Sequence, residues 1–267
     1  MRVLIVASGS MGDVAPYTGL GAGLRVAGHE VTLAAHEPFR TYVTGTGLGF
    51  RPLPGDLRGM LANAPGGLGP RALARQFRLA RPLIAALGAG IVDAVTAVRP
   101  DVMLLSTMVA PLGYQVAEAY RVRRAGVFLQ PVHPTREFGS VLLGGRPLGA
   151  AANRLTGLAA TWAIQPLYAE PIRELRRRLG LPRVRLAALR REQEFAAPTF
   201  HGFSAAVVPR PADWPAPLRV TGFWWPAGRR GRRRRPGAGR RGCRRRPEAP
   251  WGGCRPQPRD AWRGCRP

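Results

Sequence analysis

The chain has 267 residues, of which 45% are hydrophobic, and a formal net charge of +26. That length and apolar content are enough for a sizeable buried core. No stretch approaches the roughly 18 apolar residues that a membrane span needs, and the first apolar run is too short for a signal peptide. We therefore expect a cytoplasmic protein without a membrane-spanning segment.

The first 35 residues predict a strand, a turn, a helix and a second strand. The run at 3–7 is apolar at every position, as in a strand that is covered on both faces. A helix is expected from about residue 15 to 27, ended by Gly28, with the next strand at 31–35. Glycines inside this helix lower its propensity, so we expect close helix–sheet packing at Gly19, Gly21 and Gly23.

The turn between this strand and this helix is the first candidate site. Gly9 and Gly12 bracket it, and their backbone freedom allows the close approach of another group. Asp13 is predicted as the helix N-cap, beside backbone N–H groups that have no partner inside the helix. A carboxylate at such a place suits binding and proton transfer.

Residues 71–208 predict further alternation of helices and strands. Helices are expected at 71–98, 109–120 and 150–179, and strands at 101–106, 125–129 and 205–208. Pro82 should break or kink the first of these helices. The βαβ order predicts an α/β fold with a doubly wound parallel sheet. A loop is expected at 59–69, and the irregular stretch 131–149 should cover the carboxyl edge of the sheet, where ligands of open α/β folds bind.

The composition changes after residue 226. From residue 228 to the end there are 15 Arg against Glu248 and Asp260, a net charge of +13. This stretch has no Val, Ile, Leu, Met, Phe or Tyr, so it cannot bury a core of its own. We therefore divide the chain into a folded domain at 1–226 and an Arg-rich tail at 227–267 that is disordered or the product of a shifted reading frame.

Two other interpretations of the tail, a zinc site and a basic arm, differ in their support. Its three cysteines lie too far apart for the paired spacing of a zinc site, and no His accompanies them, so no metal is expected. A basic arm for anionic lipid or nucleic acid is physically reasonable, with Trp251 and Trp262 available to stack on bases or lie in a bilayer interface. Of these partners, nucleic acid is the less favoured.

Three stretches resemble a known family: GSMGDVAPYTGLGAGLRVAGHEVTLAA at 9–35, FLQPVHPTREF at 128–138, and FSAAVVPRPADWPAPLRVTGFWWP at 203–226. In this order they resemble the N-terminal half of GT-B glycosyltransferases. The most similar group is the sterol and antibiotic glucosyltransferase-like enzymes with a family 28 N-terminal domain. The resemblance implies one Rossmann-like, acceptor-binding domain of a two-domain enzyme.

The resemblance also assigns roles to the first turn. Asp13 matches the aspartate that is proposed to deprotonate the acceptor hydroxyl, although a plain helix cap is the simpler interpretation. A carboxylate is a weak base, so its contribution must come from its position and from charge developing on the sugar. Gly9, Ser10 and Gly12 match the loop near the donor's diphosphate, where backbone N–H groups and the helix dipole favour an anion. Members of the family invert the anomeric centre without a metal, so no cofactor is expected.

The stretch after residue 129 supplies weaker candidates. Gln130, His133 and Thr135 are predicted to line the acceptor cleft, but a solvated or hydrogen-bonded loop histidine is the simpler interpretation of His133. Phe128 and Trp162 are expected in the core.

The donor-binding features of the family are missing from the tail, which has no F-G-S turn and no H-G-G loop. We therefore expect the C-terminal donor-binding domain to be absent and this chain alone to be inactive. The intact enzyme is expected to move a hexose from a UDP- or dTDP-linked sugar to a hydroxyl of a sterol, lipid or polyketide antibiotic. Such lipophilic acceptors also suggest peripheral contact with a membrane.

The sequence also bears on two functions of other classes. A nicotinamide-dependent oxidoreductase is disfavoured because the first strand is followed by G-x-x-G, not by G-x-G-x-x-G. A chain without Lys also cannot supply a catalytic Tyr–Lys pair. A non-catalytic binding module that docks through its basic arm on anionic membrane or nucleic acid stays open.

Overall fold

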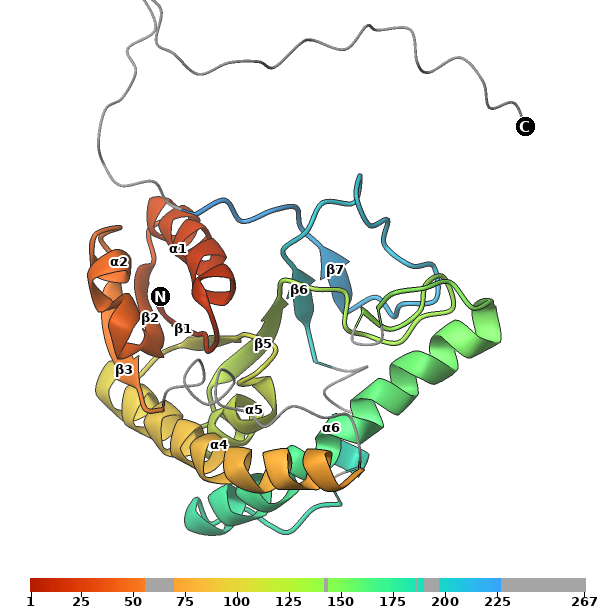
Figure 1. Ribbon diagram of the computed structural model, residues 1–267. Coiled ribbons are helices and arrows are strands. Elements are labelled where there is room, and N and C mark those ends of the chain that lie inside the picture. The colour runs from red at the N-terminus through yellow and green to blue at the C-terminus, as the bar shows by residue number, and fades with distance from the viewer. Residues whose placement is uncertain (56–69, 142–143, 186, 190–196, 227–267) are drawn as a thin grey trace, which may run out of the picture. The chain divides into compact units, whose positions relative to one another are not determined.

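A parallel β-sheet forms the centre of the computed structural model (Figure 1). The structure describes residues 1–55, 70–141, 144–185, 187–189 and 197–226. In spatial order the strands are β3-β2-β1-β4-β5-β6-β7, and all neighbours pair in parallel. The strand bounds are β1 (Arg2–Val6), β2 (Glu30–His36), β3 (Gly49–Leu53), β4 (Val102–Leu105), β5 (Arg123–Phe128), β6 (Thr199–His201) and β7 (Leu218–Val220).

Helices cover both faces of this sheet. Their bounds are α1 (Met11–Val26), η1 (Glu37–Phe39), α2 (Arg40–Thr44), α4 (Pro70–Val98), α5 (Ala110–Ala119) and α6 (Ala150–Arg178). Successive β1 residues point to opposite faces, so Val3 and Ile5 pack with α1 while Leu4 and Val6 pack with α4 and α5. Burial on both faces explains why the run at 3–7 is apolar throughout. The predicted Rossmann-like, doubly wound α/β fold is confirmed.

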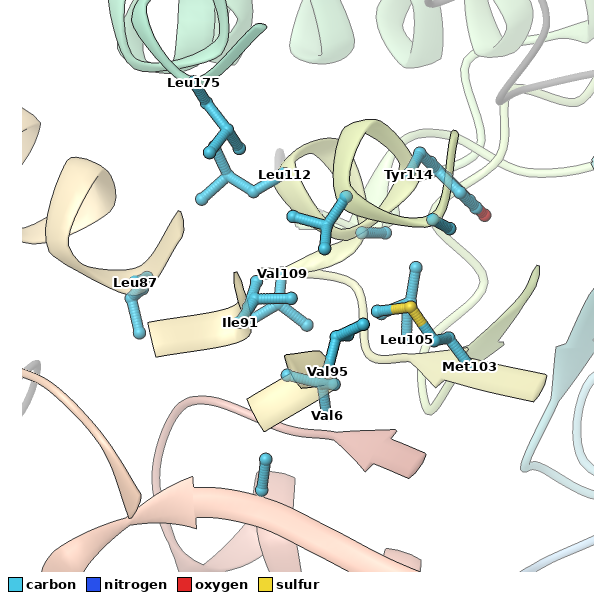
Figure 2. Packing of buried hydrophobic residues seen from close by; sticks show 14 of the residues in the cluster. Val6, Leu87, Ile91, Val95, Met103, Leu105, Val109, Leu112, Tyr114 and Leu175 are labelled. Carbon is cyan, nitrogen blue, oxygen red and sulfur yellow. The ribbon is translucent and has the colours of Figure 1, made fainter. Parts of the chain in front are cut away.

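The larger core lies between the sheet and helices α4, α5 and α6. Figure 2 shows Ile91 and Val95 of α4 beside Leu105 of β4, with Leu112 of α5 facing Leu175 of α6. All five side chains are buried, and each contributes about 1.5–3 kcal/mol relative to an exposed position. These contacts fix the carboxyl ends of β1 and β4, where the candidate site lies.

Helix α4 departs from two expectations. Its segment 78–98 has 21 residues and a mean hydropathy of 1.5, so by length and composition it is apolar enough to span a membrane, and the expectation that no stretch reaches that length was wrong. Because Ile84, Leu87 and Ile91 are buried in the core, we interpret it as a core helix. Pro82 does not break the helix, which continues through it from Pro70 to Val98.

The end of the folded domain also differs from the prediction. Residues 205–208 form no strand, because the N–H groups of Val207 and Val208 both donate to the Ser204 carbonyl in a turn. The sheet instead continues through β6 and β7, which flank this segment in sequence. The predicted loop at 59–69 and the tail at 227–267 lie outside the described residues.

Glycines of α1 allow the close packing that their positions suggested. A Cβ at Gly21 would approach the Leu48 side chain to 2.7 Å, and a Cβ at Gly19 would collide with the Trp225 carbonyl oxygen. Gly23 has nothing within 4 Å, so packing gives no account of it. The segment that follows β7 therefore lies against α1, and this contact is reinforced by the rings of Tyr17 and Trp224, 5.9 Å apart.

Candidate active site

The turn after β1 holds the main candidate, Asp13. Ser10 is the N-cap of α1 and Asp13 is the third residue of the helix, so the prediction that Asp13 is the N-cap was wrong. The first turn of the helix starts earlier in the chain than expected because Ser10 adopts an extended backbone and its carbonyl accepts from Asp13 N–H at 3.0 Å.

The Asp13 carboxylate is held on one side by Ser10. The backbone N–H and the hydroxyl of Ser10 donate to Asp13 Oδ2 at 2.8 and 2.9 Å. Both bonds end on Oδ2, so neither occupies Oδ1. Gly9 has φ of +139°, and a Cβ there would overlap the carboxylate. The turn therefore requires glycine at position 9, both for its backbone conformation and for space.

The start of α1 is open to solvent around this half-buried carboxylate. Ser10 and Gly12 are exposed, and Gly9 is buried. Backbone N–H groups at a helix start favour an anion. The arrangement can accept a proton at Asp13 and hold a negative group beside it. The predicted contact of Gly9, Ser10 and Gly12 with a diphosphate stays a prediction, and the Ser10 hydroxyl donates to Asp13.

Two buried hydroxyl groups, those of Ser8 and Tyr17, form hydrogen bonds close to this turn, and the sequence predicted neither contact. Ser8 Oγ lies 2.8 Å from His36 Nε2, at the carboxyl ends of the neighbouring strands β1 and β2. The Tyr17 hydroxyl donates to the Val127 carbonyl at 2.7 Å. Burial, with a smaller contribution from the Asp13 charge, raises the pKa of Tyr17 far above its usual range, so the phenol stays protonated. Parallel pairing of the first two predicted strands was the signal that could have joined Ser8 to His36.

The second set of predicted residues does not form one surface. Gln130 is exposed, whereas His133 and Thr135 are buried. Thr135 donates its hydroxyl to Asp213 Oδ1 at 2.6 Å, and Asp213 Oδ2 also accepts the N–H of Arg136 at 3.0 Å. These contacts tie the stretch after β5 to the segment before β7. The acceptor-cleft role of all three predicted residues stays a prediction.

His133 belongs to a buried aromatic cluster with Phe128, His201, Phe203 and Trp214. The His133 ring stacks on Phe128 at 5.5 Å and meets the His201 ring edge-on at 5.2 Å, and His201 stacks on Trp214 at 4.6 Å. Phe128 is in the core as expected. The cluster thus joins the end of β5 to the end of β6.

Both imidazoles of this cluster are held neutral by their surroundings. Burial, together with the His201 charge, lowers the pKa of His133 to about 3. Burial lowers the pKa of His201 to about 4, against a smaller opposing contribution from the backbone of Gln130. Among the residues that the structure describes, no three His, Cys, Asp or Glu side chains come together in a way that could hold a metal ion.

This strand order, with helices on both faces of a parallel sheet, defines a Rossmann-like domain that resembles one half of the GT-B fold. The calicheamicin glycosyltransferase CalG4 has a TM-score of 0.61 to this chain at 12% identity, over 83% of this chain and 52% of that one. At so low an identity the likeness shows the fold alone.

Sequence comparison supports the same family. Residues 3–120 match the model of the glycosyltransferase family 28 N-terminal domain. The chain is 32% identical over 254 residues to O-mycaminosyltylonolide 6-deoxyallosyltransferase of Streptomyces fradiae, covering 84% of this chain and 54% of that enzyme. It is 28% identical over 231 residues to a sterol 3-beta-glucosyltransferase of Neurospora crassa, covering 84% of this chain and 14% of that enzyme. The chain thus spans about half, or less, of the length of these relatives.

Proposed function

We propose that residues 1–226 bind the acceptor in an inverting hexosyltransferase and that Asp13 is its general base. The observation that carries this proposal is the carboxylate geometry: Oδ2 is fixed by two hydrogen bonds from Ser10 at the solvent-exposed start of α1. A base that is fixed in this way can be positioned against a substrate hydroxyl, which a freely rotating surface aspartate cannot. The family 28 match over residues 3–120 supports the assignment.

The proposed reaction is a single displacement at the sugar. The acceptor oxygen forms a bond to the anomeric carbon while its proton passes to Asp13. The bond from the anomeric carbon to the diphosphate breaks, and the nucleoside diphosphate leaves with the electron pair. One displacement inverts the anomeric centre, and the proton transfer needs neither a metal nor a cofactor.

The glycines and Ser10 have separate tasks in this proposal. Ser10 is a positioning residue, since its N–H and hydroxyl both bind Asp13. Gly9 leaves space for the carboxylate, and Gly12 leaves the start of α1 open to the diphosphate. Gln130, His133 and Thr135 shape the acceptor side, the last two from buried positions.

The substrates are proposed from the relatives. Their names specify a sterol in one case and O-mycaminosyltylonolide in the other, so we propose a lipophilic hydroxyl compound. Because the chain spans about half the length of the Streptomyces enzyme, we propose that a second half binds the UDP- or dTDP-sugar and that this chain alone binds the acceptor without transfer. We further propose a cytoplasmic location with peripheral contact to a membrane.

A binding experiment tests the acceptor role. The full chain is titrated with a sterol and, separately, with a macrolide while tryptophan fluorescence is followed. We expect saturable binding of one class, equal in Asp13→Asn and in the matched control Asp93→Asn, because the base acts after binding. Absence of saturable binding to both classes would contradict the proposal.

A complementation experiment tests the reaction. The chain is mixed with the separately produced C-terminal half of the Streptomyces relative and with UDP- and dTDP-sugars. We expect glycoside formation that is lost in Asp13→Asn and retained in Asp93→Asn. Transfer by the chain without any donor half would contradict the proposed division of labour.

A further inference from the structure

The first half of α6 carries an exposed apolar face. Leu155 is 67% exposed and Trp162 is 59% exposed, which corrects the expectation that Trp162 lies in the core. They are seven residues apart, about two helical turns, so they lie on one face. We call this surface the α6 apolar face and define it by Leu155 and Trp162, together with the small side chains of Ala151 and Ala159 beside them.

The opposite face of the same helix segment is part of the domain. Asn153, Gly157 and Ala160 are buried there, and a Cβ at Gly157 would meet the Pro134 backbone at 2.9 Å. Figure 1 shows this half of α6 at the outer edge of the domain, beyond β6 and β7. The helix is therefore anchored on one side and presents an apolar strip on the other, the pattern of helices that lie in a membrane interface.

A hollow of about 410 Å³ adjoins this face at the start of α6. Ala150, Ala151, Leu155 and Leu158 form its apolar lining, and Arg136 and Arg154 complete it. Arg136 is exposed and Arg154 is about two-fifths exposed. Two guanidinium groups beside an apolar hollow match the phosphate and the adjoining acyl chains of a phospholipid.

The charged residues in the sequence around this face are mainly cationic. No Asp or Glu occurs between Glu137 and Glu170, whereas Arg146 and Arg154 lie within that stretch. Asp213 lies 3.6 Å from Arg154, and it already accepts the Thr135 hydroxyl and the Arg136 N–H. Along residues 138–169 the chain therefore carries cationic side chains and no acidic ones, as an anionic surface requires.

We propose that the α6 apolar face docks on an anionic lipid bilayer, with Leu155 and Trp162 at the boundary of headgroups and acyl chains and a lipid phosphate between Arg136 and Arg154. A second copy of the chain fits this face less well, because a twofold contact buries the same patch on both copies and would place four arginines in one interface. The inference names the surface for the membrane contact in the proposed function, but lipid binding requires no sugar transfer.

Vesicle sedimentation of the full chain tests the proposal, with vesicles of equal parts phosphatidylcholine and phosphatidylglycerol. Leu155→Gln/Trp162→Gln should bind about tenfold more weakly than the wild type, because two apolar side chains are lost from the interface. The matched control Val26→Gln/Val207→Gln alters residues that are 90% and 68% exposed elsewhere and should bind as the wild type does. Every variant keeps residues 227–267, so any binding by the Arg-rich tail is common to all.

Two further measurements separate the apolar contribution to vesicle binding from the contribution of charge. At about 1 M salt, where the screening length is about 3 Å, the difference between the α6 variant and the control should persist. Arg136→Gln/Arg154→Gln should bind the mixed vesicles more weakly and pure phosphatidylcholine unchanged, whereas the control Arg2→Gln/Arg123→Gln should match the wild type on both. Thermal unfolding checks that each variant is folded.

Equal vesicle binding by the α6 variant and the wild type would overturn the proposal. So would a variant that changes only the oligomeric state in size-exclusion chromatography, since the face would then be a contact between copies. If the glycoside assay fails while vesicle binding depends on Leu155 and Trp162, the proposed function falls and this inference stands. If glycoside formation succeeds while vesicle binding does not depend on Leu155 and Trp162, only the lipid-binding surface is rejected.

Discussion

Two groups of polar side chains lie at the carboxyl edge of one sheet, and they differ in their access to water. At the turn after β1, Ser10 is exposed, Asp13 is half-buried, and its carboxylate is bound on one oxygen. Beyond β5 and β6, His133 and His201 are buried among aromatic rings. The first group can meet a substrate, whereas the second contributes chiefly to packing.

Position at a strand end therefore does not by itself make a functional residue. Both groups come after parallel strands, where ligands of open α/β folds bind. The two groups differ because the chain takes a different course beyond each strand. Gly9 turns the chain outward after β1, whereas the segment around Trp214 covers His133 and His201.

The largest effect is expected at Asp13. In the complemented enzyme, Asp13→Asn should lower glycoside formation by about 10²–10⁴-fold, the contribution of a positioned base. The amide keeps the size of the side chain, so the thermal midpoint should stay close to that of the wild type. Product formation with both halves present measures the rate. Unchanged turnover would show that Asp13 only stabilises the start of the helix. Asp13 would then have no more part in the reaction than the buried His133.

Substitutions in the aromatic cluster should instead change the stability of the folded domain. His201→Ala removes a fully buried ring and should cost about 3 kcal/mol, lowering the thermal midpoint by about 6–12 °C. His201→Phe keeps the ring contacts and should recover most of that loss. Calorimetry of the full chain provides the measurement. A midpoint unaffected by His201→Ala would show that the cluster is loosely packed.

The two imidazoles also predict a pH dependence of stability. Their pKa values in the folded state, about 3 for His133 and about 4 for His201, lie below the ordinary value of about 6.5. The unfolded chain therefore binds more protons as the pH falls, so stability is full above about pH 6.5 and declines toward pH 4. Urea unfolding at several pH values should show this decline, and His133→Phe/His201→Phe should make it shallower. An identical profile in that variant would assign the decline to other groups.

A smaller effect is expected at Ser10. Ser10→Ala removes one of the two donors to Asp13 Oδ2 and leaves the backbone N–H in place. We expect about 1 kcal/mol lower stability and a several-fold slower reaction with the acceptor KM unchanged, since Ser10 positions the base. Ser10→Thr, which keeps the hydroxyl, should restore both. A change in KM alone would indicate direct contact with the substrate.

Local patterns predicted the first part of the fold well. Strand, helix and strand over the first 35 residues were confirmed because both strands are buried on both faces and Gly28 ends the helix at a positive φ. The same patterns failed for β3, β6 and β7. The strand β3 contains Arg51 and Pro52 at the edge of the sheet, and β6 and β7 have only three residues each. Such short strands are defined by their neighbours, not by an apolar run of their own.

The candidate site was half predictable. The sequence placed Asp13, Gly9 and Ser10 in one turn because they are close together in the chain. It gave no sign that Ser10 would donate two hydrogen bonds to one carboxylate oxygen, or that His36 would reach Ser8 from the next strand. It also could not separate the buried His133 from the exposed Gln130, since they lie only three residues apart in an irregular segment.

The sequence by itself determined the fold class, the turn with its carboxylate and the resemblance to family 28, because these depend on residues close together in the chain. Only the tertiary structure decided which polar groups stay accessible. Burial of His133 and His201 requires Trp214, which comes from a separate segment of the chain, and exposure of Trp162 depends on which side of α6 meets the domain. Accessibility is set by contacts between distant segments, and local composition carries little information about them.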